Sequence, residues 1–270
     1  MIKFFRHIRQ RLIQEKNMGK YLKYAIGEIL LVVIGILIAI QINNWNENRK
    51  KQALELELLK QVNSEIESLE YDVSTDLLFL KLGQRSHDRI FKAIRNNAPY
   101  TNDLVYDFLW LKDDEYIYPK SAAYDKIKME GLELIKDRIL KDELQLLYES
   151  YFPRISKDHS FYPDIELLLS DYYIKNFIPN YDTSITFFEI IENDTIQLPR
   201  YKIKNGEKVP EPEGYIPLDF EKLKKDTEFL MLLKQAKKYR DYKIRRYNLT
   251  KEGMMTTKRL IELRLNKDKK

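Results

Sequence analysis

The sequence predicts a mainly α-helical protein: an N-terminal transmembrane helix continuous with a long helical stalk. The stalk is expected to pack with several further helices into an extracytoplasmic helical bundle, with room for one small β-hairpin. An apolar run near the N-terminus predicts the span. The chain then continues from Gly35 to Gly83 without glycine or proline, which favours one long helix. With only 8 Gly and 9 Pro in 270 residues, long helices are expected rather than many strands.

The expected transmembrane helix covers residues 24–45. Its centre, Ala25 to Ile42, reads AIGEILLVVIGILIAIQI. At about 1.5 Å per residue, this stretch and its flanks can cross a hydrocarbon core of roughly 30 Å. Tyr21, Tyr24 and Trp45 flank it, and such aromatic rings favour the two membrane–water interfaces. We therefore expect them to anchor the helix in the lipid bilayer.

The cations predict the orientation of the span. Segment 1–23 carries seven lysines and arginines, whereas only Arg49, Lys50 and Lys51 follow the span closely. The side with more cations normally stays in the cytoplasm, so residues 46–270 are expected in the periplasm. Segment 1–23 is also amphipathic. It is either a helix lying on the anionic inner leaflet or a topology signal without lasting membrane contact.

Polar and small residues inside the span suggest a role for Glu28 and a face for helix packing. Glu28 is its only ionisable residue, and it has either an ion-coupling role or a structural one in assembly. Gly27, Gly35 and Ala39 place small side chains near one face of the helix. That face is expected to allow close packing against another membrane helix.

A stalk helix over about 46–96 is expected from a hydrophobic stripe with steps of three and four residues. Asp76 falls on this stripe. The pattern leaves two alternatives open, a dimeric coiled-coil seam and a face covered by the chain's own later helices. The residues of this stalk seam are Leu59, Val62, Ile66, Leu69, Val73 and Leu80.

The remaining chain is expected to form further helices of one extracytoplasmic domain, residues 46–270. One is expected near 103–112. A second begins at a Ser121 cap and ends at Gly131. An amphipathic helix spans Leu134 to Tyr151, and an apolar run extends from Ile165 to Ile178.

Residues 192–218 contain four prolines and two glycines and are interpreted as an irregular excursion. Within it, Asn205-Gly206 between Ile203 and Val209 predicts a two-residue hairpin. A long C-terminal helix over about 218–265 is expected to follow, with Gly253 as a candidate break. If it runs antiparallel to the stalk, its end returns toward the membrane.

The charge distribution is asymmetric. The net charge is +5, but residues 52–218 are acidic while 1–51 and 219–270 are basic. Our interpretation is that the acidic middle and the basic C-terminal helix attract each other within one fold. Nucleic-acid binding is not expected, because the basic C-terminal helix would lie outside the cytoplasm.

The residues offer little recognisable chemistry. The chain has no cysteine, which excludes thiolate catalysis and cysteine-held metals. His7, His87 and His159 are scattered, and no nucleophile elbow, Walker loop or zinc-helix motif occurs. The acidic run Asp113–Glu115 is either a cation or basic-partner site or a solvated loop. We therefore predict no catalytic residue, metal or cofactor and leave any small-molecule ligand unassigned.

Two blocks carry a family resemblance. The stretch Tyr24–Glu47, YAIGEILLVVIGILIAIQINNWNE, resembles the signature of a widespread family of bacterial membrane proteins of unknown function. The stretch from Tyr124 through Gly131 to Tyr148 is similar to the second recurring block of that family. The resemblance implies a bacterial envelope protein in the inner membrane of a two-membrane cell. It implies no activity.

The function expected from these patterns is a membrane-anchored interaction, scaffold or accessory protein of the cell envelope, without enzymatic activity. The expected partner is a second copy of the chain or another envelope membrane protein. Two alternatives remain: an ion-coupled envelope subunit that uses Glu28, and an envelope hydrolase with a pocket at His87 or His159.

Overall fold

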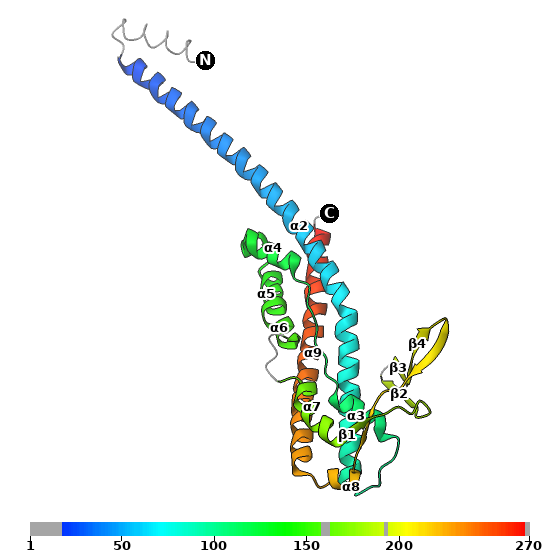
Figure 1. Cartoon of the computed structure of the whole chain (residues 1–270). Coiled ribbons are helices and arrows are strands. Elements are labelled where there is room, and N and C mark those ends of the chain that lie inside the picture. The colour runs from blue at the N-terminus through cyan, green and yellow to red at the C-terminus, as the bar shows by residue number, and fades with distance from the viewer. Residues whose placement is uncertain (1–17, 158–162, 192–193, 268–270) are drawn as a thin grey trace. The chain divides into compact units, whose positions relative to one another are not determined.

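The computed structural model describes residues 18–157, 163–191 and 194–267, and the chain divides into two compact units after Glu57. The amphipathic segment up to residue 17 lies outside the described residues, as do His7 and His159. The side chains of Tyr21 and Tyr24 also lie outside the described part, so their expected interface role stays a prediction. The structure is mainly helical, as predicted (Figure 1).

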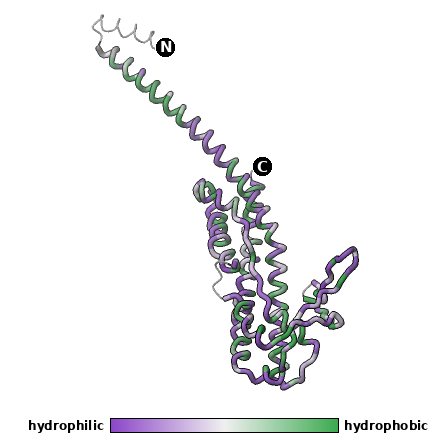
Figure 2. Tube along the Cα trace, viewed as in Figure 1, coloured by the Kyte–Doolittle hydropathy of each residue, from purple (hydrophilic) through white to green (hydrophobic). Residues whose placement is uncertain are grey.

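Helix α2, Met18–Arg95, is a single α-helix of 78 residues. In the first unit the apolar side chains of this helix are exposed, and Figure 2 shows the run as a mostly hydrophobic stretch of the chain. Its length and composition allow it to cross a membrane. Around Gly27 and Gly35 a side chain would meet no atom within 4 Å, so this face is open in the single chain.

The second unit is organised by two long antiparallel helices, the part of α2 after Glu57 and α9, Thr227–Lys267. Three contacts fix their register. Lys258 Nζ lies 3.0 Å from Glu70 Oε1, the Tyr247 hydroxyl donates to Asp76, and Gln84 donates to Asp241. The ion pair joins the basic C-terminal helix to the acidic middle of the chain, as the charge distribution predicts.

The stalk seam is buried within the single chain. All six of its residues have at most 1% of their surface exposed. Of the two alternatives left open by the sequence, the structure therefore favours a face covered by the chain's own elements. A dimeric coiled coil along this stripe would require these contacts to be replaced.

Six α-helices, a 3₁₀-helix and a π-helix complete the described helical structure. Helices α5, α6 and α7 and the π-helix η2 pack against α9. The elements are α3 (Leu104–Lys112), α4 (Ala122–Glu130), η1 (Leu132–Leu134), α5 (Arg138–Leu146), η2 (Leu147–Tyr151), α6 (Phe152–Ile155), α7 (Ile165–Asn176) and α8 (Phe220–Leu223).

The expected continuous helix from Leu134 to Tyr151 is wrong in detail. The short η1 segment ends at Leu134, and Asp137 starts α5 because its carboxylate accepts from the Ile139 and Leu140 amides. The chain then widens into η2 opposite Gly253. A Cβ at Gly253 would lie 2.7 Å from the Tyr151 ring, so this glycine admits the ring rather than breaking α9.

Two of the expected caps differ from the structure. Ser121 occupies the N-cap of α4, but its hydroxyl donates to the Asp125 carboxylate instead of accepting from the backbone. Gly131 follows α4 with φ +96° and ψ 132°, a conformation that favours glycine but is not the left-handed helical one that commonly ends a helix.

The strands form three two-stranded antiparallel sheets, not one hairpin, and they begin at Phe177, ahead of the expected excursion. Asn205 (φ 54°) and Gly206 (φ 83°) make the β4–β5 turn, which confirms this hairpin. The pairs are β1 (Phe177–Pro179) with β6 (Tyr215–Pro217), β2 (Phe187–Ile191) with β3 (Asp194–Leu198), and β4 (Arg200–Lys204) with β5 (Glu207–Glu211).

An aromatic core lies where α3, α7 and α9 meet. The Phe108 and Phe177 rings are 4.9 Å apart edge to face, and Tyr173 stacks on Phe177 at 4.2 Å. The buried Tyr173 hydroxyl donates to the Phe108 carbonyl at 2.8 Å. These contacts hold α3 firmly against α7, which places the end of α3 beside α9.

Gly83 gives the first testable prediction. A Cβ at this position would lie 1.2 Å from Arg240 Nη1 and 2.6 Å from the Trp110 carbonyl oxygen. Gly83→Ala should therefore lower the free energy of unfolding by about 3 kcal/mol, because this buried site has no room for a methyl group. Chemical unfolding of the full chain in nanodiscs, followed by circular dichroism, measures it. Gly35→Ala in the same helix is the matched control, since open space surrounds it; equal stability of the two variants would contradict the prediction.

Candidate functional site: a buried ionisable cluster and its cavity

The inner face of α9 changes from apolar to polar near its middle. Its buried positions repeat at steps of three and four residues, which is the spacing of a core stripe. Arg240 and Lys243 occupy two of these positions and are 2% and 3% exposed. The stripe comprises Phe229, Leu233, Ala236, Arg240, Lys243, Tyr247, Thr250, Met254, Thr257 and Ile261.

Arg240 donates hydrogen bonds to the backbone carbonyls at the end of α3. Its Nη1 donates to the Trp110 carbonyl at 2.7 Å, and its Nη2 donates to the carbonyls of Leu111 (2.9 Å) and Asp113 (2.7 Å). The last carbonyls of a helix lack intrahelical partners and carry partial negative charge, so a cation there is favourable. Burial lowers the pKa of the guanidinium, while Asp114 and Asp113 act in the opposite direction.

Lys243 forms a buried ion pair with Asp114, with 2.6 Å between Nζ and Oδ2. The same ammonium lies 3.4 Å from the centre of the Tyr116 ring, a cation–π contact. Burial lowers the pKa of Lys243 to about 8 despite Asp114. Asp114 also accepts from the Ile165 amide at 2.7 Å, which ties the start of α7 to the cluster.

Asp76 contributes a third acid from the polar position of the α2 stripe. Its carboxylate accepts a hydrogen bond from the buried Tyr247 hydroxyl at 2.9 Å. Burial raises the pKa of Asp76 to about 6, although this hydrogen bond opposes the change. The polar groups on both long helices therefore meet at one level of the unit.

The acidic run after α3 is not a solvated loop. Asp114 is held by Lys243, as described, and its side chain is 1% exposed. Burial raises the pKa of Asp113 to about 6. Burial, and then the neighbouring Asp76, Asp113 and Asp114, raise the pKa of Glu115 to about 7. Four carboxylates thus gather around the two buried cations Arg240 and Lys243, which leaves an excess of acid.

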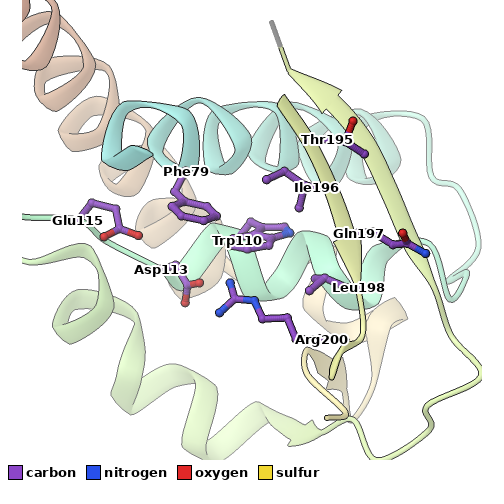
Figure 3. Close-up of a pocket in the computed structure, with 9 residues that line it drawn as sticks. All are labelled: Phe79, Trp110, Asp113, Glu115, Thr195, Ile196, Gln197, Leu198 and Arg200. Atoms are coloured by element: carbon purple, nitrogen blue, oxygen red, sulfur yellow. The ribbon is translucent and has the colours of Figure 1, made fainter. Parts of the chain in front are cut away.

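A cavity of about 430 Å³ opens beside this cluster (Figure 3). Phe79 and Trp110 stack at 5.5 Å to form one wall, and strand β3 forms the opposite wall. Figure 3 shows Asp113 and Glu115 at one end and the Arg200 guanidinium turned toward Asp113. The cavity therefore combines an apolar centre with charged groups of both signs.

The other predicted site residues lie elsewhere. Glu28 belongs to the apolar part of α2 in the first unit, whereas the cluster belongs to the second. His87 lines a separate apolar groove of about 560 Å³ between α2 and α9. Its Nδ1 lies 3.1 Å from Asp88, burial lowers its pKa, and the groove-lining residues include no hydroxyl or thiol. In the described part of the chain, no group of three or more acids and histidines is placed to hold a metal ion.

Arg240, Lys243 and Arg200 were not singled out from the sequence. A signal existed for the first two, because charged residues at core positions of an apolar stripe require buried partners. Asp76 on the α2 stripe gave the same signal and was noticed. Arg200 had no such signal, since it stands in a strand whose position in space depends on the fold.

These features define a mainly helical protein in which α2 is able to cross a membrane and the second unit is built around a buried ionisable cluster. The model of a family described as "Family of unknown function (DUF6090)" matches residues 28–163, and the chain belongs to this family. No curated protein matches the chain, and no solved structure does.

The buried ion pair gives the second prediction. Lys243→Met should lower the free energy of unfolding by about 3 kcal/mol, because it leaves the Asp114 carboxylate buried without its cation. Adding Asp114→Asn should recover part of the loss, since the uncompensated charge is then removed. Unfolding of single and double variants measures this coupling. Lys251→Met on the exposed side of α9 is the control; a loss as small as that of the control would contradict the prediction.

Glu115 gives a prediction about pH. Its pKa rises from 4.5 to about 7 on folding, so the folded state binds the proton more tightly. Stability from this group is present below pH 4.5 and is lost as the pH rises through about 7. Glu115→Gln should match the wild type at pH 4 and exceed its stability at pH 8 by about 1 kcal/mol, allowing for partial solvent exposure. Glu207→Gln on the exposed β5 should show no such divergence in pH-dependent unfolding.

Proposed function

We propose that the protein is a membrane-anchored interaction or accessory protein of the bacterial cell envelope. In this proposal α2 spans the inner membrane with its N-terminus in the cytoplasm, and the second unit stands in the periplasm. The observation that carries the proposal is the continuity of α2, which passes without interruption from an exposed apolar run into a unit with its own core. The excess of cations before the span supports the orientation.

The stalk seam is covered by the chain itself, so we assign the contact with a partner to another surface. The β-extension, the described residues of 177–217, presents apolar side chains outward. Its strands β2 and β4 are exposed at Phe188, Ile190, Tyr201 and Ile203. Each sheet has only two strands, so edges with free backbone groups are present for pairing with an added strand.

The partner proposed for this surface is another envelope membrane protein. An isolated two-stranded hairpin gains little stability in water from its own contacts. All five residues of β4 are exposed, and the strand alternates basic side chains with Tyr201 and Ile203. Such a strand suits a partner that offers both an open sheet edge and acidic side chains.

Photocrosslinking in intact cells tests the proposal. A photoreactive residue replacing Ile203 should give crosslinks to a second protein, identified by mass spectrometry, because this side chain is 68% exposed on the β-extension. The same residue replacing Tyr71 on α2, which is 76% exposed, is the matched control and should give far fewer. Crosslinks confined to the chain itself at both positions would overturn an interaction function at this surface.

A further inference from the structure

The cavity beside the cluster contains acids that lack partners. Within the described residues, neither the Asp113 nor the Glu115 carboxylate forms a hydrogen bond or an ion pair through its side-chain oxygens. Arg240 donates three hydrogen bonds to backbone carbonyls, and the Lys243 ammonium forms an ion pair with Asp114, so neither cation forms an ion pair with Asp113 or Glu115. Arg240, Lys112 and Arg200 attract the Asp113 carboxylate from a distance, but within the described residues no cation forms an ion pair with either acid, so this end of the cavity can take a further positive group.

The same end of the cavity also carries a donor for a ligand acceptor, because the Arg200 guanidinium is turned toward Asp113 (Figure 3). Arg200 forms only a long ion pair, with 3.9 Å between its Nε and Glu213 Oε1, and its side chain is 57% exposed. Trp110 is 2% exposed, and its indole N–H has no acceptor within the described residues. In Figure 3 this nitrogen points toward β3, on the wall of the cavity. A buried donor without a partner is costly.

The middle of the cavity is apolar. Phe79 stacks on Trp110 with 15° between the ring planes, and Ile196 and Leu198 face them from β3 (Figure 3). Five of the nine lining residues are polar or charged, so the cavity offers an apolar wall within a mainly polar lining. The volume of about 430 Å³ lies in the range of roughly 300–1,000 Å³ that pockets for small molecules occupy.

We propose that this cavity binds a free amino acid with an apolar side chain. The ammonium group lies against Asp113 and Glu115, the carboxylate faces Arg200, and the side chain packs on Phe79 and Trp110. A metal ion is the less favoured occupant, because the described residues offer no group of three ligands. The assignment goes beyond the interaction function proposed above and does not require it.

The tryptophans make the binding measurable in the full chain. The protein contains two, Trp45 and Trp110, so Trp45→Phe leaves Trp110 as the sole indole reporter in the cavity wall. The variant is placed in nanodiscs and titrated with three molecules that share one side chain: L-phenylalanine, phenethylamine and 3-phenylpropionate. L-Phenylalanine should give a saturable change in emission, and the other two should bind at least about tenfold more weakly, since each lacks one charged group.

Variants separate the contributions of the acidic and the basic groups of the site. Asp113→Asn and Glu115→Gln should each weaken the binding of L-phenylalanine about tenfold or more, because each removes a negative charge while the shape of the cavity is retained. Arg200→Gln should weaken the binding of L-phenylalanine and of 3-phenylpropionate, which carry a carboxylate, but leave the binding of phenethylamine unchanged. Lys204→Gln, an exposed residue of the same strand, is the matched control and should change nothing.

Two results would overturn the assignment. One is the absence of saturable L-phenylalanine binding up to about 10 mM with the protein folded by circular dichroism. The other is equal binding of all three molecules, which would mean an apolar pocket without charge recognition. Either outcome leaves the crosslinking test of the proposed function unaffected, because that test measures contact of the exposed Ile203 side chain with a second protein and not ligand binding.

Discussion

The second unit depends on one buried cation. The Arg240 guanidinium donates to three carbonyls at the end of α3, and it reaches them only because Gly83 of α2 has no side chain. This arrangement fixes α9, α2 and α3 at one level. It also directs the chain after α3 along α9, so that Asp114 meets Lys243 and the first amide of α7. An apolar stripe alone would tolerate sliding of one helix along the other, whereas directional bonds to specific carbonyls do not.

The same arrangement explains why acids accumulate beside α9. The segment 113–116 is drawn in by two cations but brings three carboxylates, and Asp76 adds a fourth from α2. Burial is the main cause of the raised pKa values of Asp113 and Glu115, and for Glu115 the neighbouring acids add to it. Strained electrostatics of this kind often mark binding sites, where a ligand rather than the protein completes the charge balance.

Much of the helical structure could be predicted from the sequence. Periodicity and the lack of glycine and proline predicted α2 and its buried stripe, and Asn205-Gly206 predicted the β4–β5 hairpin. The sequence could not show that Gly253 receives the Tyr151 ring, because that contact joins segments about a hundred residues apart. For the same reason the strands from Phe177 to Ile191 were missed: their alternation is short, and their pairing with later strands depends on the helices that position them. The sequence indicated the acids of the candidate site, Asp76 and the acidic run. Its cations could not be told from surface charges in the sequence.

The β1–β6 pair joins the two ends of the β-extension. Phe177–Pro179 pairs with Tyr215–Pro217, so the chain leaves the helices and returns to them at almost the same place. An excursion closed at its base in this way can change in length or sequence with little cost to the frame that carries it. The excursion supplies β3 and Arg200, and the family match ends at residue 163, before it begins. One wall of the cavity therefore comes from a surface insertion. A change in the sequence of this insertion would alter the ligand preference of the cavity without altering the helices that carry it.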